Sequence, residues 1–268
     1  MTRLDEPQTA GSVDDVEEMI EPAVPERLRW MTGLLKAQPG DTIVDLGCGT
    51  GNALSMLAER LEVDLVGVDS SAAGLRAAAG TLHRMPGGMR LLVQADLADS
   101  IPLADASVDR GLCHNVLEFL AGPDAFVEEV HRVLRPGGRF VLSHSDFDTL
   151  VFTSEDVQLT RRLVRSYCDT QQDWMDSVDG TIGRRLAHLV QRSRLQVEDV
   201  QARVNLSLRF RPGELGYGYA HNLAHALRSS GQIDPAELGG WLDGLRRLDE
   251  EDGFLFSIND YAVVCTRP

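Results

Sequence analysis

The segment IVDLGCGTGN, residues 43–52, constrains the fold of this chain more than any other stretch. It joins a short apolar run, typical of a buried strand, to three glycines at alternate positions and then to a helical pattern. Glycine lets the backbone turn sharply and come close to a ligand, and the free N–H groups of the next helix point into that turn. A dinucleotide-binding turn follows GxGxxG, whereas residue 52 is Asn52 and the spacing here is GxGxG. Asp45, just before the turn, suits a ligand with a cationic end better than a pyrophosphate.

Strand and helix patterns alternate along the first half of the chain, which is typical of βαβ units in a parallel sheet. Short strands are expected at 42–46, 65–68, 90–95, 108–113 and 139–143. The second half differs, because residues 200–210 alternate strictly between apolar and polar side chains. This alternation predicts an antiparallel edge strand with one buried face and one wet face. Two helices, at about 215–230 and 235–249, and a strand at 254–265 complete the chain.

We therefore predict an α/β fold, namely a Rossmann-like, doubly wound, mostly parallel sheet with an antiparallel last strand and a helical cap. Residues 1–24 are expected to form a flexible arm, and residues 25–268 one domain. The core of that domain is expected at about 25–146, 195–208 and 254–268, and its cap at about 147–194 and 209–253.

Two further acids stand at the ends of predicted strands. Asp69 ends the second strand in GVDSS, where a carboxylate can bind ribose hydroxyls. Asp96 ends the third strand, where it can accept a hydrogen bond from an adenine amino group. Either acid alone could equally be a helix cap. Three acids at the ends of three successive strands, around one glycine turn, indicate a ligand site.

With these motifs the chain resembles the class I S-adenosylmethionine-dependent methyltransferases, especially the branch similar to ubiquinone and menaquinone biosynthesis methyltransferases. The resemblance covers about residues 25–146 and rests on VDLGCGTGN, GVDSS, QADLADSIPLADASVDRGLCHNVLEFL and EEVHRVLRPGGRFVLSHSD. It implies a methyltransferase domain with S-adenosyl-L-methionine as cofactor. The residues that it assigns to the cofactor are Asp45 near the ammonium group, Gly47, Gly49 and Gly51 along the methionine part, Asp69 with Ser70 at the ribose, Asp96 and Leu97 at the adenine, and His114 and Asn115 beside the sulfonium. Arg27 and Arg29 are weak candidates for holding the cofactor carboxylate.

Methyl transfer from a sulfonium is an in-line displacement, and it needs a base only where the acceptor loses a proton. His144 is the first candidate for that base and Asp146 the next, since both follow the fifth predicted strand at the edge where doubly wound sheets bind ligands. Tyr217 and His221 are candidates on the cap side of the acceptor. His144 could instead bond a loop, and the two cap residues could be packing or helix surface. No metal is expected, because His221 and His225 have HxxxH spacing without the Glu or a third ligand.

The formal net charge of −15 speaks against nucleic-acid binding, which rests on a basic surface, and against anionic membranes. The expected partner is a small-molecule methyl acceptor, neutral or cationic, and a homodimer is left open. The beginning of the chain is acidic and lacks the apolar region of a secretion signal, so the expected localisation is cytoplasmic. Four scattered cysteines indicate neither a zinc ribbon nor a disulfide framework.

The predicted function is methyl transfer to N, O or C of a small molecule in secondary metabolism. One alternative is a methyltransferase-like protein that binds the cofactor without transferring methyl, either as a regulatory subunit or in non-methyl chemistry such as cyclisation. The other is a nicotinamide-dependent oxidoreductase, against which the GxGxG spacing speaks.

Overall fold

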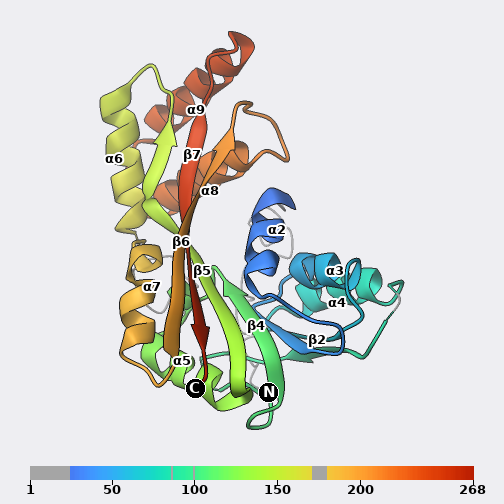
Figure 1. Ribbon diagram of the computed structural model, residues 1–268. Helices are drawn as coiled ribbons and strands as arrows, with labels where there is room; N and C mark the ends of the chain where they lie inside the picture. Colours follow the sequence, from blue (N-terminus) through green and yellow to red (C-terminus); the bar gives the residue numbers. More distant parts are fainter. Residues whose placement is uncertain (1–24, 86, 99, 171–179) are drawn as a thin grey trace, which may run out of the picture.

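The computed structural model describes residues 25–85, 87–98, 100–170 and 180–268, so the arm expected at 1–24 lies outside them. These residues form a seven-stranded sheet with the order β3-β2-β1-β4-β5-β7-β6 (Figure 1). The strands are β1 (Thr42–Leu46), β2 (Asp64–Asp69), β3 (Arg90–Gln94), β4 (Val108–His114), β5 (Leu134–Phe152), β6 (Gln196–Ser207) and β7 (Phe256–Thr266). The first five strands run parallel, and β7 runs antiparallel to both its neighbours. The predicted mostly parallel sheet with an antiparallel last strand is confirmed.

Helices cover both faces of this sheet, as the alternating pattern predicts. On one face lie α2 (Pro25–Leu34), α3 (Asn52–Ala58) and α4 (Ala72–Leu82), and on the other α5 (Pro123–Val133) and α7 (Ile182–Gln191) (Figure 1). Each face has its own apolar cluster, with Leu54 and Leu75 under the first group of helices and Phe126 and Leu186 under the second. Within the described ranges, no helix is long and apolar enough to cross a membrane.

Strands β5 and β7 extend beyond this core and carry a further apolar cluster. Three helices pack around the extension and form the cap: α6 (Val157–Cys168), α8 (Leu215–Ser229) and α9 (Pro235–Glu250) (Figure 1). Aromatic rings fill the cap, and the ring centroid of Phe152 lies 5.2 Å from that of Trp241 and 4.9 Å from that of Phe256. We expected α7 in the cap as well. The structure packs it against the core instead, because its apolar face meets β5 and β7.

The alternation of apolar and polar side chains along β6 is confirmed. The apolar side chains, however, lie on the solvent face of the strand, and the polar ones on its buried face. The apolar residues point outward, and Val204 and Leu206 are 55% and 61% exposed. Asn205 and Ser207 are buried instead. The inner face of β6 meets polar partners, among them the carboxylate of Asp260 on β7, so the polar groups satisfy one another inside the protein.

Candidate active site

A pocket of about 250 Å³ opens at the carboxyl ends of the parallel strands. Its lining comes from the turns that follow β1, β2, β3 and β4, and consists of Gly47, Asp69, Ser70, Ala95, Asp96, Leu97, Asn115, Val116, Phe119 and Leu120. Six of these residues are among those predicted to bind the cofactor. The pocket lies where the strand order reverses between β1 and β4, which is the place where doubly wound sheets bind ligands.

The glycine turn brings backbone to the edge of this pocket. Gly47, Gly49 and Gly51 have φ angles of 79°, 51° and 77°, in the left-handed region that favours glycine. A Cβ on Gly47 would lie 2.2 Å from Cγ2 of Val116, whereas a Cβ on Gly49 would meet nothing within 4 Å. The turn thus excludes side chains by conformation at all three positions, and Gly49 is the glycine with open space beside it.

Asp69 and Asp96 stabilise their own surroundings while they line the pocket. The carboxylate of Asp69 accepts the N–H of Gly49 at 2.7 Å and that of Ser71 at 2.8 Å, which ties the glycine turn to the start of α4. Asp96 accepts the N–H of Ala98 at 2.9 Å. Each carboxylate oxygen has two lone pairs, so both acids keep acceptor capacity for further groups. These acceptors fit the hydroxyls of a ribose and the amino group of an adenine.

Asp45 lies on β1, one residue before its end, and is buried. Burial, and in second place the carboxylate of Asp69, raise the pKa of Asp45 to about 7. A cation placed beside this group favours its charged form. Asp45, Gly49, Gly51 and His114 are the four predicted cofactor residues that are not part of the pocket lining.

The end of β4 forms another wall of the pocket, next to the glycine turn. Asn115 has a φ of 52°, a conformation that asparagine tolerates better than most residues, and it turns the chain toward a short 3₁₀-helix, η1 (Leu117–Phe119). Nδ1 of His114 lies 3.2 Å from Oγ of Ser143 on β5. The two residues that the resemblance assigns beside the sulfonium therefore differ, because Asn115 lines the pocket and His114 contacts the neighbouring strand.

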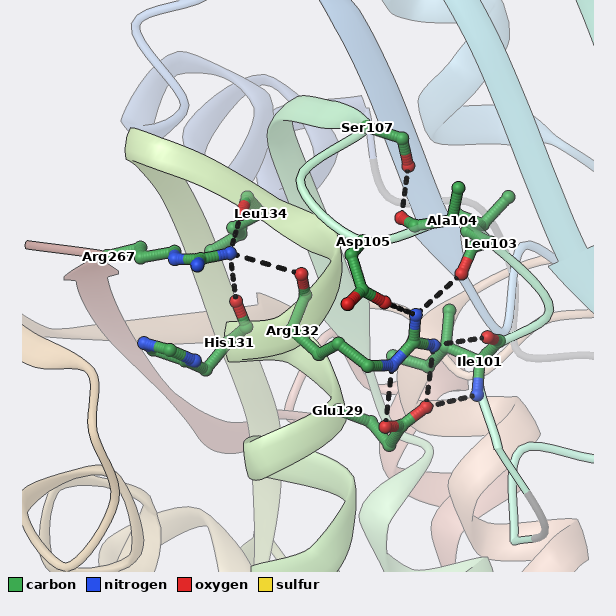
Figure 2. Close-up of polar contacts among 10 residues, drawn as sticks. All are labelled: Ile101, Leu103, Ala104, Asp105, Ser107, Glu129, His131, Arg132, Leu134 and Arg267. Atoms are coloured by element: carbon green, nitrogen blue, oxygen red, sulfur yellow. Dashed lines mark hydrogen bonds and ion pairs between the residues drawn. The ribbon is translucent and has the colours of Figure 1, made fainter.

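The loop between β3 and β4 is held by Arg132 of α5 (Figure 2). The guanidinium group donates to the carbonyl of Ile101 at 2.8 Å and to that of Leu103 at 2.7 Å. It also forms ion pairs with Glu129 and Asp105, both at 2.8 Å. We call these contacts of Arg132 the clamp. Because this loop continues directly from the residues predicted to hold the adenine, the clamp supports that side of the pocket.

Two of the predicted catalytic residues, His144 and Asp146, lie on β5 and are fully buried. Asp146 forms an ion pair with Arg184 of α7, whose Nη2 donates to Oδ1 at 2.6 Å. Nδ1 of His144 lies 2.7 Å from the carbonyl oxygen of Ser145. Neither side chain belongs to the pocket lining, and a role for either in catalysis stays a prediction.

The other two predicted catalytic residues, Tyr217 and His221, lie together on α8 in the cap. Their rings stack with centroids 3.9 Å apart, and both also contact the ring of Phe210. Neither belongs to the pocket lining. In the part of the chain that the structure describes, no group of three His, Cys, Asp or Glu side chains could hold a metal ion.

One group of buried polar residues has no counterpart among the predicted site residues. Ser145, Asn205, Tyr219 and Asp260 are buried and joined to one another by hydrogen bonds. The sequence does carry a signal for two of them. Asn205 is a polar position in the alternation of β6, and Asp260 is the acidic residue of the closing strand.

The two arginine candidates for the cofactor carboxylate have different surroundings. Arg27 is buried, and its Nε lies 3.9 Å from Oδ2 of Asp260. Arg29 is exposed and pairs with Glu26 at 2.6 Å on the same helix. Only Arg27 therefore lies near the buried polar group.

Residues 44–142 match the family model described as "Methyltransferase domain". The chain is 31% identical over 219 residues to an uncharacterized 37.1 kDa protein in transposon TN4556 of Streptomyces fradiae, covering 80% of this chain and 60% of that protein. It is 32% identical over 120 residues to a ubiquinone biosynthesis O-methyltransferase of Cupriavidus pinatubonensis, covering 44% of this chain and 47% of the relative. The chain thus spans about half the length of the curated relatives that it matches.

Solved structures share the fold. A geranyl diphosphate C-methyltransferase from Streptomyces coelicolor, in complex with S-adenosyl-L-homocysteine, has a TM-score of 0.52 at 15% identity, covering 91% of this chain and 76% of that chain. The [4+2]-cyclase SpnF has a TM-score of 0.55 at 16% identity, covering 91% and 80%. At these identities the likeness concerns the fold alone. Together with the named relatives, the family match shows that residues 44–142 form a methyltransferase domain.

Proposed function

We propose that this protein transfers a methyl group from S-adenosyl-L-methionine to N, O or C of a small molecule in secondary metabolism. The observation that carries the proposal is the pocket itself, where Asp69 and Asp96 present carboxylate oxygens beside the glycine turn. The family match over residues 44–142 supports the same reaction. The net charge of −15 supports an acceptor that is neutral or cationic.

In this proposal each part of the pocket holds one part of the cofactor. Asp69 and Ser70 bind the ribose, and Asp96 binds the adenine amino group. The glycine turn follows the methionine part, with Asp45 near its ammonium group. When bound there, the cofactor supplies an electrophilic methyl group. The protein then has to hold the acceptor in line with that group, at about 3–3.5 Å, and to exclude water.

We propose that the acceptor lies between the pocket and the cap. The stacked rings of Tyr217 and His221 offer an aromatic surface on the cap, and the face of a tyrosine ring attracts a cation. Where the acceptor has to lose a proton, His144 is the proposed base and Asp146 the next candidate. Both lie on β5, the strand next to the β4 end that forms the pocket wall.

Isothermal titration calorimetry with S-adenosylhomocysteine tests the cofactor site. We expect micromolar binding by the wild type and a loss of about tenfold or more in Asp69→Ala, because hydrogen bonds to a charged group contribute about 1.5–3 kcal/mol. Asp243→Ala is the matched control, since Asp243 is exposed on α9 and pairs with Arg246 of the same helix. Its affinity should equal that of the wild type. A folded wild type that does not bind would overturn the proposal.

A second candidate function is cofactor binding without methyl transfer, in non-methyl chemistry or as a regulatory subunit. One observation favours it, namely that none of the four predicted catalytic residues belongs to the pocket lining. Incubation with methyl-labelled cofactor and a panel of amines, phenols and electron-rich rings separates the two candidates. Label in any product supports methyl transfer, whereas cofactor binding with no labelled product supports the second candidate.

A further inference from the structure

A row of polar side chains crosses the carboxyl edge of the sheet, from the pocket to the outermost strand. Its members come from four strands that are neighbours in the sheet: Asn115 just after β4, Ser145 on β5, Asp260 on β7 and Asn205 on β6. Tyr219 of α8 reaches the same row from the cap. Of these five residues, Asn115 alone lines the pocket, while Ser145 and Asp260 are fully buried.

Ser145 is the centre of the row, with four hydrogen bonds to its neighbours. Its backbone N–H donates to Oδ1 of Asn115 at 2.8 Å, and its hydroxyl accepts from Nδ2 of the same amide at 3.3 Å. The hydroxyl donates to Oδ1 of Asp260 at 2.6 Å and accepts from the hydroxyl of Tyr219 at 3.3 Å. Oδ2 of Asp260 in turn accepts from Nδ2 of Asn205 at 2.7 Å.

The directions of these bonds follow from Asp260. A carboxylate only accepts, so the single proton of the Ser145 hydroxyl points to it, and both lone pairs of that hydroxyl are left for Asn115 and Tyr219. The amide of Asn115 then fits in one orientation only, with its nitrogen on the hydroxyl and its oxygen on the backbone N–H.

We propose that Ser145 and Asp260 are positioning residues that hold the side-chain amide of Asn115 in the orientation in which the cofactor pocket uses it. This inference rests on the proposed function, because the pocket is taken to bind S-adenosylmethionine. Neither residue lines the pocket, so both act through Asn115. Since the row is buried, water does not readily replace a missing hydroxyl, and its loss leaves the amide without a defined orientation.

A double-mutant cycle on the full chain, read by calorimetric titration with S-adenosylhomocysteine, tests the proposal. The variants are Asn115→Ala, Ser145→Ala and both together. We expect the affinity to fall about 5- to 10-fold in each single variant and no further in the double variant, because Ser145 acts through the group that Asn115→Ala has already removed. Losses that multiply in the double variant would overturn the proposal. So would wild-type affinity in Ser145→Ala.

Ser207→Ala is the matched control, because it makes the same change at another buried serine. The hydroxyl of Ser207 accepts the N–H of Gly216 at 3.1 Å, outside the row. This variant should lose thermal stability as Ser145→Ala does, and keep an affinity within about twofold of the wild type. If Ser145→Ala does not fold, Ser145→Cys takes its place. It keeps the size of the side chain, and its weaker hydrogen bonding should still reduce the affinity.

The possible failures are distinguishable. A folded wild type that does not bind S-adenosylhomocysteine overturns the proposed function and this inference with it. A wild type that binds, together with unaffected affinity in Ser145→Ala or Ser145→Cys, overturns this inference alone and leaves the row a purely structural element.

Discussion

Asp45 should make the cofactor affinity of this protein depend on pH. Burial, with a further contribution from the carboxylate of Asp69, raises its pKa to about 7. In the proposed function the ammonium group of S-adenosylhomocysteine lies beside Asp45, where it favours the ionised carboxylate. Binding below pH 7 therefore requires that Asp45 release a proton. The thiols of Cys48 and Cys113 do not titrate in this range, because burial and the charge of Asp45 raise their pKa values.

The size of the effect follows from the pKa. With a pKa of about 7, about 10% of Asp45 is ionised at pH 6 and about 90% at pH 8. If the ammonium group binds the ionised form only, the apparent dissociation constant is the intrinsic one divided by that fraction. It should therefore be about tenfold higher at pH 6 than at pH 8, which corresponds to about 1.4 kcal/mol. About 0.9 proton should be released per ligand bound at pH 6, and about 0.1 at pH 8.

Calorimetric titrations at pH 6, 7 and 8, each in two buffers with different ionisation enthalpies, measure both quantities. Asp45→Asn is the control, because it has nearly the same shape and no charge. We expect it to bind more weakly than the wild type at pH 8, with no pH dependence and no proton release. A wild-type affinity that is flat from pH 6 to pH 8, without proton release, would refute the reasoning. Equal pH profiles in both proteins would assign the titration to another group.

The same pKa has a second consequence, for stability in the absence of cofactor. Asp45 keeps its proton in the folded protein up to about pH 7, but loses it near pH 3.8 when unfolded. From about pH 4 to pH 7 the unfolded state therefore binds fewer protons, and the free energy of unfolding falls as the pH rises. The whole difference is at most about 4 kcal/mol. Urea unfolding at pH 5 and pH 7 should show this fall in the wild type and a smaller one in Asp45→Asn.

Three further predictions concern the glycine turn, the loop after β3 and the strand β6. In urea unfolding, Gly47→Ala should lower the free energy of unfolding by about 3 kcal/mol or more, because its Cβ would overlap the side chain of Val116. Gly49→Ala should lower it by about 1 kcal/mol, because its Cβ would meet open space. Arg132→Gln should weaken S-adenosylhomocysteine binding about threefold or more by releasing the loop after β3; unchanged affinity in calorimetry would make the clamp irrelevant to the pocket. Leu206→Gln should change the free energy of unfolding by less than about 0.5 kcal/mol and Asn205→Leu should lower it by about 2–4 kcal/mol. The reverse order would show that β6 buries its apolar face.

The central part of the fold could be predicted because its signals are local. The strand expected at 42–46 coincides with β1, since a short apolar run bounded by turns has few other solutions. The meeting of Asp69 and Asp96 in one pocket also needed no long-range information. Parallel strands end at the same edge of a sheet, so acids at the ends of neighbouring strands lie close together.

The length of β5 could not be predicted, because it depends on a partner far along the chain. The strand was expected at 139–143, but it runs from Leu134 to Phe152. The polar stretch SHSD is typical of a loop. In the folded protein β7 pairs with this stretch, placing Ser145 opposite Asp260, and so extends the strand. The outward apolar face of β6 has a similar cause, since only the tertiary structure determines which face is covered.

The extension of β5 also explains why the predicted base, His144, and the inferred positioning residue, Ser145, have different surroundings although they are neighbours in the sequence. Side chains alternate along a strand, so His144 and Asp146 share one face and Ser145 lies on the other. The first face contacts α7 through the ion pair of Asp146 with Arg184. On the second face, the hydroxyl of Ser145 accepts a hydrogen bond from the amide of Asn115 on the pocket wall. Cofactor affinity should therefore respond to Ser145→Ala, while His144→Ala, measured in the same titration, should affect it only through stability. A larger loss in His144→Ala would mean that the face toward α7 reaches the cofactor after all.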